Sequence, residues 1–122
     1  MPEMKQSKMF HFLRDGKIED FNRELQRGTA VDLENADLRG VDLRGCNLKG
    51  VSLKGAYMSY TDLRGLDLRF SNLEGASIKS AKISGAYFPE NIMPEEILMS
   101  VTQGTRMRTV KHHVYEEKGK EQ

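Results

Sequence analysis

Several features that often indicate a protein's compartment or chemistry are scarce in this 122-residue chain, which has one cysteine, no tryptophan, three prolines and a formal net charge of only +1. A single cysteine excludes an internal disulfide. A nearly balanced charge gives no strong attraction to nucleic acid or to an anionic membrane. No apolar run approaches the roughly 18 residues that a transmembrane helix needs. We therefore expect one small soluble domain.

The signals of an enzyme are also missing. The sequence shows no nucleophile with a plausible base and orienting acid, no phosphate-binding loop, and no Cys or His pair at metal-ligand spacing. His11 lies among aromatic residues and is interpreted as partly buried, while the adjacent His112 and His113 would point apart on a helix or a strand. We expect no catalytic residues, no cofactor, no metal and no small-molecule substrate.

What the sequence does contain is a strict five-residue period from Val31 to Glu90. The third residue of each five is large and apolar, the first is mostly small, and glycine often stands fifth, as in ADLRG at residues 36–40. A period of five drifts off the face of an α-helix within two turns. In an extended segment residues two apart point to the same side, and glycine suits the tight turn that must follow. We therefore expect short extended segments joined by corners.

First and third residues of each repeat should face inward. Cys46 is a first-position residue and is interpreted as a small core hydrophobe in a reducing compartment, the alternative being a reactive thiol, for which no activating arrangement lies nearby. The N-terminus lacks the apolar core and cleavage site of a signal peptide, so we expect a cytoplasmic protein. The expected core is formed by Leu33, Leu38, Leu43, Leu48, Leu53, Met58, Leu63, Leu68, Leu73, Ile78, Ile83 and Phe88.

The repeat resembles that of the pentapeptide-repeat family, which reads Ala, then Asp or Asn, then Leu, then two variable residues. ADLRG matches it outright, and VDLRG, TDLRG and CNLKG match it nearly. The resemblance implies an all-β solenoid, a right-handed quadrilateral β-helix with four repeats per coil. The twelve repeats of residues 31–90 would then make about three coils, with residues twenty apart lying above one another.

The segments around the repeats are interpreted as caps, because a terminal coil would expose its core and its strand edges. Residues 1–30 form the N-terminal helical cap, with a first short helix and then an amphipathic helix from about Lys17 to Arg27. Residues 91–105 form a C-terminal cap helix from about Pro94 to Gln103. Residues 106–122 are expected to be a polar, mobile tail.

Two surfaces are candidates for binding a partner. Arg44, Arg64, Lys49 and Arg69 could form a basic stripe for an acidic partner. The tyrosines and a phenylalanine at outward or corner positions could form an aromatic patch of the kind enriched at interfaces. The alternatives are a solvated charged surface and aromatics covered by the C-terminal segment. The patch comprises Tyr57, Tyr60 and Phe70, with Arg39 nearby.

Two functions remain. The first is a non-enzymatic protein–protein interaction scaffold with an unknown protein partner, present as a monomer or an end-to-end homodimer. The second comes from the resemblance, since some pentapeptide-repeat proteins mimic DNA and bind type II topoisomerases such as gyrase. A mimic needs a long, strongly negative rod, whereas three coils span only about 15 Å at the usual strand spacing. Residues 31–90 are also neutral, with eight basic and eight acidic side chains. The scaffold is therefore favoured.

Overall fold

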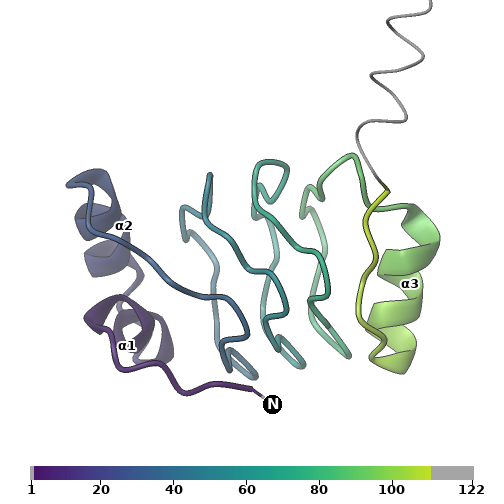
Figure 1. Cartoon of the computed structure of the whole chain (residues 1–122), viewed down its shortest axis with the longest axis horizontal. Coiled ribbons are helices and arrows are strands. Elements are labelled where there is room, and N and C mark those ends of the chain that lie inside the picture. Colours follow the sequence, from purple (N-terminus) through teal and green to yellow (C-terminus); the bar gives the residue numbers. More distant parts are fainter. Residues whose placement is uncertain (1, 111–122) are drawn as a thin grey trace, which may run out of the picture.

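The computed structural model describes residues 2–110. This part of the chain has three helices, α1 (Lys8–Arg14), α2 (Ile18–Gln26) and α3 (Pro94–Gln103). Between α2 and α3 the chain winds into a stack of loops. Helices α1 and α2 lie at one end of the stack and α3 lies at the other (Figure 1).

The helices lie where the sequence predicts them. α2 is shorter than predicted by one residue at each end, and it buries Phe21. α3 begins at Pro94, whose fixed φ suits the first helical position, and it ends before Gly104, which adopts a φ of 76°. α1 follows Ser7, whose hydroxyl accepts a hydrogen bond from the Phe10 backbone N–H at 3.2 Å.

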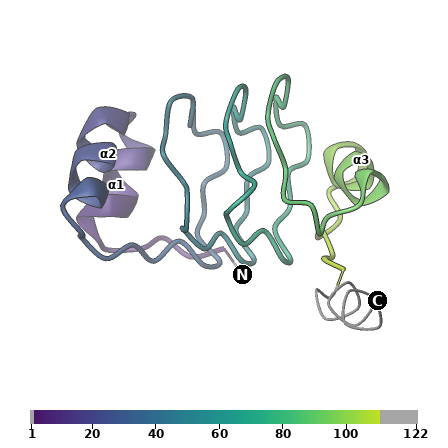
Figure 2. The ribbon, with the colours of Figure 1, turned by 90° about the horizontal axis from the view of Figure 1, so that it is seen from above.

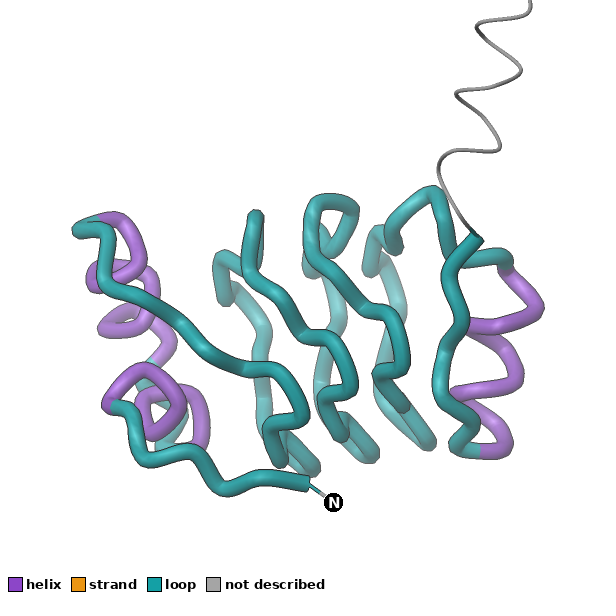
Figure 3. The backbone as a smooth tube through the Cα atoms, viewed as in Figure 1, coloured by secondary structure: helices purple, strands orange, loops and turns teal. Residues whose placement is uncertain are grey.

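The predicted fold class, an all-β solenoid built as a quadrilateral β-helix, is wrong for the described residues. The stack of loops contains no β-strand (Figure 3). Neighbouring loops pair only through isolated parallel bridges, such as that between Asp42 and Asp62. The five-residue period explains the difference. The fifth residue often takes a left-handed turn conformation, as Gly45 does with a φ of 80°, so the extended stretch ends before a second bridge can follow the first.

The stacking of residues twenty apart is confirmed, although no strand forms. Asp42 bridges Asp62, and Asp62 bridges Lys82 in the next loop. The Asp62 N–H donates to the Val41 carbonyl at 2.9 Å, and the Leu43 N–H donates to the Asp62 carbonyl at 3.0 Å. Backbone hydrogen bonds therefore hold the loops in register. Figure 2 shows the loops lying side by side along the stack.

Third-position side chains fill the inside of the stack. Ten of the twelve expected core residues are buried, whereas Ile83 and Phe88, both in the last loop, are partly buried. Each buried leucine contributes roughly 1.5–3 kcal/mol relative to an exposed one. The buried ten are Leu33, Leu38, Leu43, Leu48, Leu53, Met58, Leu63, Leu68, Leu73 and Ile78.

The first-position residues fill the remaining space and satisfy their own polar groups. The buried hydroxyl of Thr61 donates to the Leu38 carbonyl at 2.9 Å, and that of Ser71 donates to the Leu48 carbonyl at 2.6 Å. Cys46 is buried, and this burial raises the pKa of its thiol to about 12. The thiol therefore stays protonated at neutral pH, as a core residue would and a reactive one would not.

The N-terminal helices cover the first loop with apolar and with polar groups. Met9, Phe10, Leu13 and Phe21 join the buried cluster of the stack. The side chain of Asn22 donates to the Gly45 carbonyl at 2.9 Å and accepts from the Asn47 N–H at 2.8 Å. An amide side chain thus takes the place of a neighbouring backbone, which keeps this edge of the first loop hydrogen-bonded.

The C-terminal segment packs against the last loop. The buried hydroxyl of Ser100 accepts from the Ile78 N–H at 2.9 Å and donates to the Thr105 carbonyl at 2.6 Å. Met107 is fully buried, and its carbonyl accepts from the Gly75 N–H at 2.7 Å.

Residues 106–110 therefore differ from the polar tail expected to begin at residue 106. The tail was expected to begin at residue 106 because Arg106 and Arg108 are charged. In an extended segment, however, the side chain of Met107 between them points the other way, into the core. The expectations for His112, His113 and the rest of the tail concern residues outside the described part of the chain.

Candidate interaction surface

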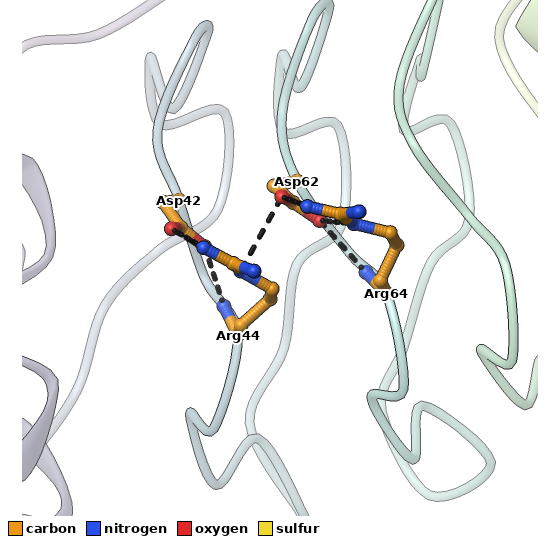
Figure 4. A network of polar contacts seen from close by, with 4 residues as sticks. All are labelled: Asp42, Arg44, Asp62 and Arg64. Carbon is orange, nitrogen blue, oxygen red and sulfur yellow. Dashed lines mark hydrogen bonds and ion pairs between the residues drawn. The ribbon is translucent and has the colours of Figure 1, made fainter.

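Acidic and basic side chains of the same repeat pair on the outside of the stack. In the third and seventh repeats, Asp42 lies two residues before Arg44 and Asp62 two residues before Arg64. The Arg44 and Arg64 Nη2 atoms lie 2.8 and 2.7 Å from the carboxylates of their own repeats. Arg44 Nε also lies 3.4 Å from Asp62 Oδ2, which links two loops (Figure 4).

Each of these aspartates also stabilises the corner that follows it. The carboxylate of Asp62 accepts from the backbone N–H of Arg64 at 3.2 Å as well as from its guanidinium. These hydrogen bonds from Arg64 lower the pKa of Asp62 to about 2. Arg69 does the same to Asp67, whose pKa is also lowered to about 2. The aspartates of the repeat therefore stabilise corners, as their regular recurrence indicates.

The expected basic stripe is largely neutralised by this pairing. Arg44, Arg64 and Arg69 each have a carboxylate of their own repeat within 2.8 Å. Lys49 differs because Asn47 replaces the aspartate in its repeat, and it has no ion pair among the described residues. The stripe also spans two faces. Arg44 and Arg64 follow the Asp42–Asp62 bridge, whereas Lys49 and Arg69 precede the corner at which the Gly50 N–H donates to the Phe70 carbonyl at 3.0 Å.

The expected aromatic patch is divided. Tyr57 is partly covered by the C-terminal segment, because Arg106 donates a hydrogen bond to its hydroxyl and stacks 5.0 Å from its ring centroid. Arg39 is paired with Asp37 at 2.8 Å. The alternative reading, cover by the C-terminal segment, therefore applies to Tyr57.

No residue between positions 2 and 110 covers Tyr60 in this way. Its side chain is 68% exposed, and its φ is 60°. This left-handed conformation costs an L-residue roughly 1–2 kcal/mol, and glycine avoids the cost. The equivalent residue twenty positions earlier is Gly40. An exposed tyrosine at a strained corner is a candidate contact residue, because local strain often marks functional positions.

A second aromatic cluster forms where three predicted residues, Lys49, Arg69 and Phe70, meet Tyr87, which was not among the predicted contact residues. The Lys49 ammonium and the Arg69 guanidinium each lie 5.6 Å from the centroid of the Phe70 ring. Arg69 also lies 5.2 Å from the ring of Tyr87. Phe70 and Tyr87 are each 60% exposed. We call Lys49, Phe70, Arg69 and Tyr87 the cation–aromatic row.

The signal for Tyr87 was present in the twenty-residue register. Tyr87 stands twenty residues after Asp67 and bridges it, so it lies beside Arg69 of the preceding loop.

A groove of about 310 Å³ adjoins the row and is lined by Arg69, Phe70, Pro89, Glu90 and Asn91. The row and its groove combine apolar area with cations, which suits recognition of a polypeptide.

The described residues offer little to other kinds of site. No group of three or more His, Cys, Asp or Glu side chains within residues 2–110 is arranged to hold a metal ion. The interpretation of His11 as partly buried is wrong, because His11 is exposed and makes only an edge contact with Phe10, at 5.6 Å between ring centroids. No described helix has both the length and the apolar character needed to cross a membrane.

Comparison with known proteins gives one match. The family model for pentapeptide repeats matches residues 29–65 and 56–89, with eight copies of the repeat. No curated protein and no solved structure matches the chain. The two matched stretches together cover the stack of loops between α2 and α3.

Proposed function

Because the chain belongs to the pentapeptide-repeat family, we propose that it is a non-enzymatic scaffold that binds another protein through the outer faces of its loops. The backbone hydrogen bonds between loops give a frame with little freedom to rearrange. A rigid frame lowers the entropic cost of binding, because its contact residues are already in position.

The observation that carries the proposal is the cation–aromatic row. Phe70 and Tyr87 are each 60% exposed, although burying an aromatic ring is favourable. Arg69 lies over both rings and is itself held at 2.8 Å by Asp67, so the rings and the cation are ordered before a partner arrives. Tyrosine, phenylalanine and arginine are the residues enriched in interface cores.

The charge pattern suggests what kind of contact the partner makes. The arginines of the outer faces are paired within their own repeats, so long-range steering is weak. We infer that the partner binds mainly by burying apolar and aromatic surface, and that moderate salt changes its affinity little.

Capture of a partner by matched variants tests the proposal. The variant Phe70→Ser with Tyr87→Ser removes both exposed rings, while Leu98→Ser removes an equally exposed apolar side chain from α3. Immobilised wild type and Leu98→Ser should retain the same protein from an extract of the native organism, and the double variant should not. Retention of that protein by the double variant at an unchanged melting temperature would refute the proposal.

A further inference from the structure

One side of the last loop has a backbone edge that is unpaired within the described residues. In the preceding loop, the Thr61 carbonyl accepts from Lys82 N–H at 3.0 Å, and the Leu63 N–H donates to the Lys82 carbonyl at 2.8 Å. The Gly65 N–H donates to the Ser84 carbonyl at 3.0 Å.

One loop later, the equivalent groups are the Ala81 carbonyl and the N–H groups of Ile83 and Gly85. None of the three has a partner among residues 2–110. We call this stretch, residues 81–85, the open edge.

Elsewhere the chain fills such edges with short extended segments. Ahead of the first loop, the Glu3 N–H donates to the Asn35 carbonyl at 2.8 Å, and the Asp37 N–H donates to the Glu3 carbonyl at 2.8 Å. Glu3 forms an isolated parallel bridge with Ala36 and lies outside the repeats. A single extended residue can therefore take the place of a missing loop, which is the geometry of strand addition to a free edge.

The large apolar side chain at the centre of the open edge, Ile83, is less covered than its equivalents in the earlier loops. Ile83 is partly buried, whereas the equivalent residues Leu43 and Leu63 are fully buried beneath the next loop. Lys82 is exposed and has no ion pair in the described part of the chain. In the same column, Arg44 reaches across to Asp62 at 3.4 Å, so opposite charges already link neighbouring loops on this face.

From this pattern we propose that the open edge binds an extended segment of a partner protein that reads acidic residue, large apolar residue, any residue. The backbone N–H of the first residue donates to the Ala81 carbonyl, and its carbonyl accepts from the Ile83 N–H. Its side-chain carboxylate pairs with Lys82. The second places its side chain over Ile83. The carbonyl of the third accepts from the Gly85 N–H. This site is separate from the cation–aromatic row and does not depend on it.

A thin segment fits this edge better than a second copy of the chain. Both views show α3 standing beyond the last loop at the same end (Figures 1 and 2). A helix is about 10 Å across, whereas paired backbones lie only about 4.8 Å apart. A second stack approaching the open edge would therefore meet α3 first. An extended segment can lie beside α3 and reach the edge.

Titration of the isotopically labelled full chain with blocked pentapeptides tests the inference by NMR. The probe is the peptide Thr-Asp-Leu-Arg-Gly, and the amide signals of Ile83 and Gly85 should shift and saturate. Replacing its Leu by Ser should weaken binding at least about tenfold, the effect of losing one buried leucine. Replacing its Asp by Lys should weaken binding about threefold, as expected for an exposed ion pair.

A charge reversal supplies the matched control. In the variant Lys82→Glu the preference should invert, so that the Lys-containing peptide binds more tightly than the Asp-containing one. The variant Lys54→Glu reverses an exposed charge in another column and should leave the preference unchanged. Saturating shifts at the Ile83 and Gly85 amides, with this inversion, support the inference.

Three outcomes would overturn it. One is the absence of a saturable shift at millimolar peptide. Another is a preference for the Asp-containing peptide that stays the same in the variant Lys82→Glu. The third is a free protein whose Ile83 and Gly85 amides are already protected from hydrogen exchange, which would mean that the edge is occupied by a second copy or by the chain itself.

Discussion

A single Asp-Leu-Arg triplet performs three separate tasks within one repeat. In residues 62–64 the leucine fills the core, the aspartate fixes the following corner, and the arginine neutralises the aspartate. Asp62 and Arg64 contact each other on the outside of the stack, whereas Leu63 points inside, because successive side chains of an extended stretch point to opposite sides. The effects of substitutions inside and outside the stack should therefore differ sharply.

The leucine gives the largest expected effect. Leu63→Ala should lower the free energy of unfolding by about 2–5 kcal/mol, because the side chain is fully buried and leaves a cavity between loops. Lys54→Ala, at an exposed position, should change it by less than about 0.5 kcal/mol. Urea denaturation measures both, and comparable losses would mean that the inside and outside of the stack are assigned wrongly.

The aspartates give the stack a dependence on acid. The pKa values of Asp62 and Asp67 are lowered to about 2 in the folded chain, so the unfolded chain binds more protons as the pH falls below about 4. Their contribution is present above this range and is lost progressively between about pH 4 and pH 2. The urea midpoint of Asp62→Asn with Asp67→Asn should fall less over this interval than that of wild type. An equal fall of the urea midpoint in the variant and in wild type would show that Asp62 and Asp67 do not cause the dependence on acid.

Tyr60 should lower stability by its backbone conformation. Tyr60→Gly should raise the free energy of unfolding by up to about 1 kcal/mol, since glycine adopts the observed φ of 60° without strain. The matched change Tyr87→Gly, at a residue with negative φ, should not stabilise the chain. A loss of stability in Tyr60→Gly would show that the tyrosine ring contributes packing that outweighs the strain.

Among the larger elements, the helices were predictable and the edge-filling segments were not. The spacing of Ile18, Phe21 and Leu25 predicts α2, and Pro94 with Gly104 brackets α3. Both signals are local. Glu3 and Met107, by contrast, bond to residues more than thirty positions away in sequence, and no local pattern marks them. Burial of Met107 shows why the tail was expected to begin too early.

The candidate site was predictable only in part for a related reason. The sequence identifies the outward residues of each repeat, so Lys49, Arg69 and Phe70 could be singled out. It does not show that the arginines bind back to their own aspartates, because that depends on the corner geometry. The predicted fold class, a β-helix, was wrong for a similar reason. Each five-residue repeat leaves room for an isolated bridge but not for a strand.

Substitution of Asn22 tests how α2 caps the first loop. Asn22→Ala removes the two hydrogen bonds to Gly45 and Asn47, so it should lower the free energy of unfolding by about 1–3 kcal/mol. Asn22→Asp keeps the acceptor for the Asn47 N–H but loses the donor, so its loss should be smaller. If Asn22→Ala unfolds like wild type in urea, water satisfies this edge and α2 contributes only its apolar face.

The described part of the molecule is a stack of loops with helices at both ends. The N-terminal end is covered by α1, α2, the Asn22 amide and Glu3, and the C-terminal end is covered by α3, Ser100 and Met107, which leave residues 81–85 unpaired within the described residues. Between them the outer faces present paired charges and the cation–aromatic row. Family membership fixes the repeat but not the partner, so the function has to be argued from these surfaces.

Photo-crosslinking from position 70 shows which face of the protein touches a partner in the cell. Phe70→benzoylphenylalanine, made in the native organism and irradiated, should yield one discrete adduct that Tyr87→Ser abolishes. The same photoreactive residue at Leu98 should yield none. An adduct from position 98 with none from position 70 would refute binding through the cation–aromatic row, since the partner would then bind α3 and not the outer face of the loops.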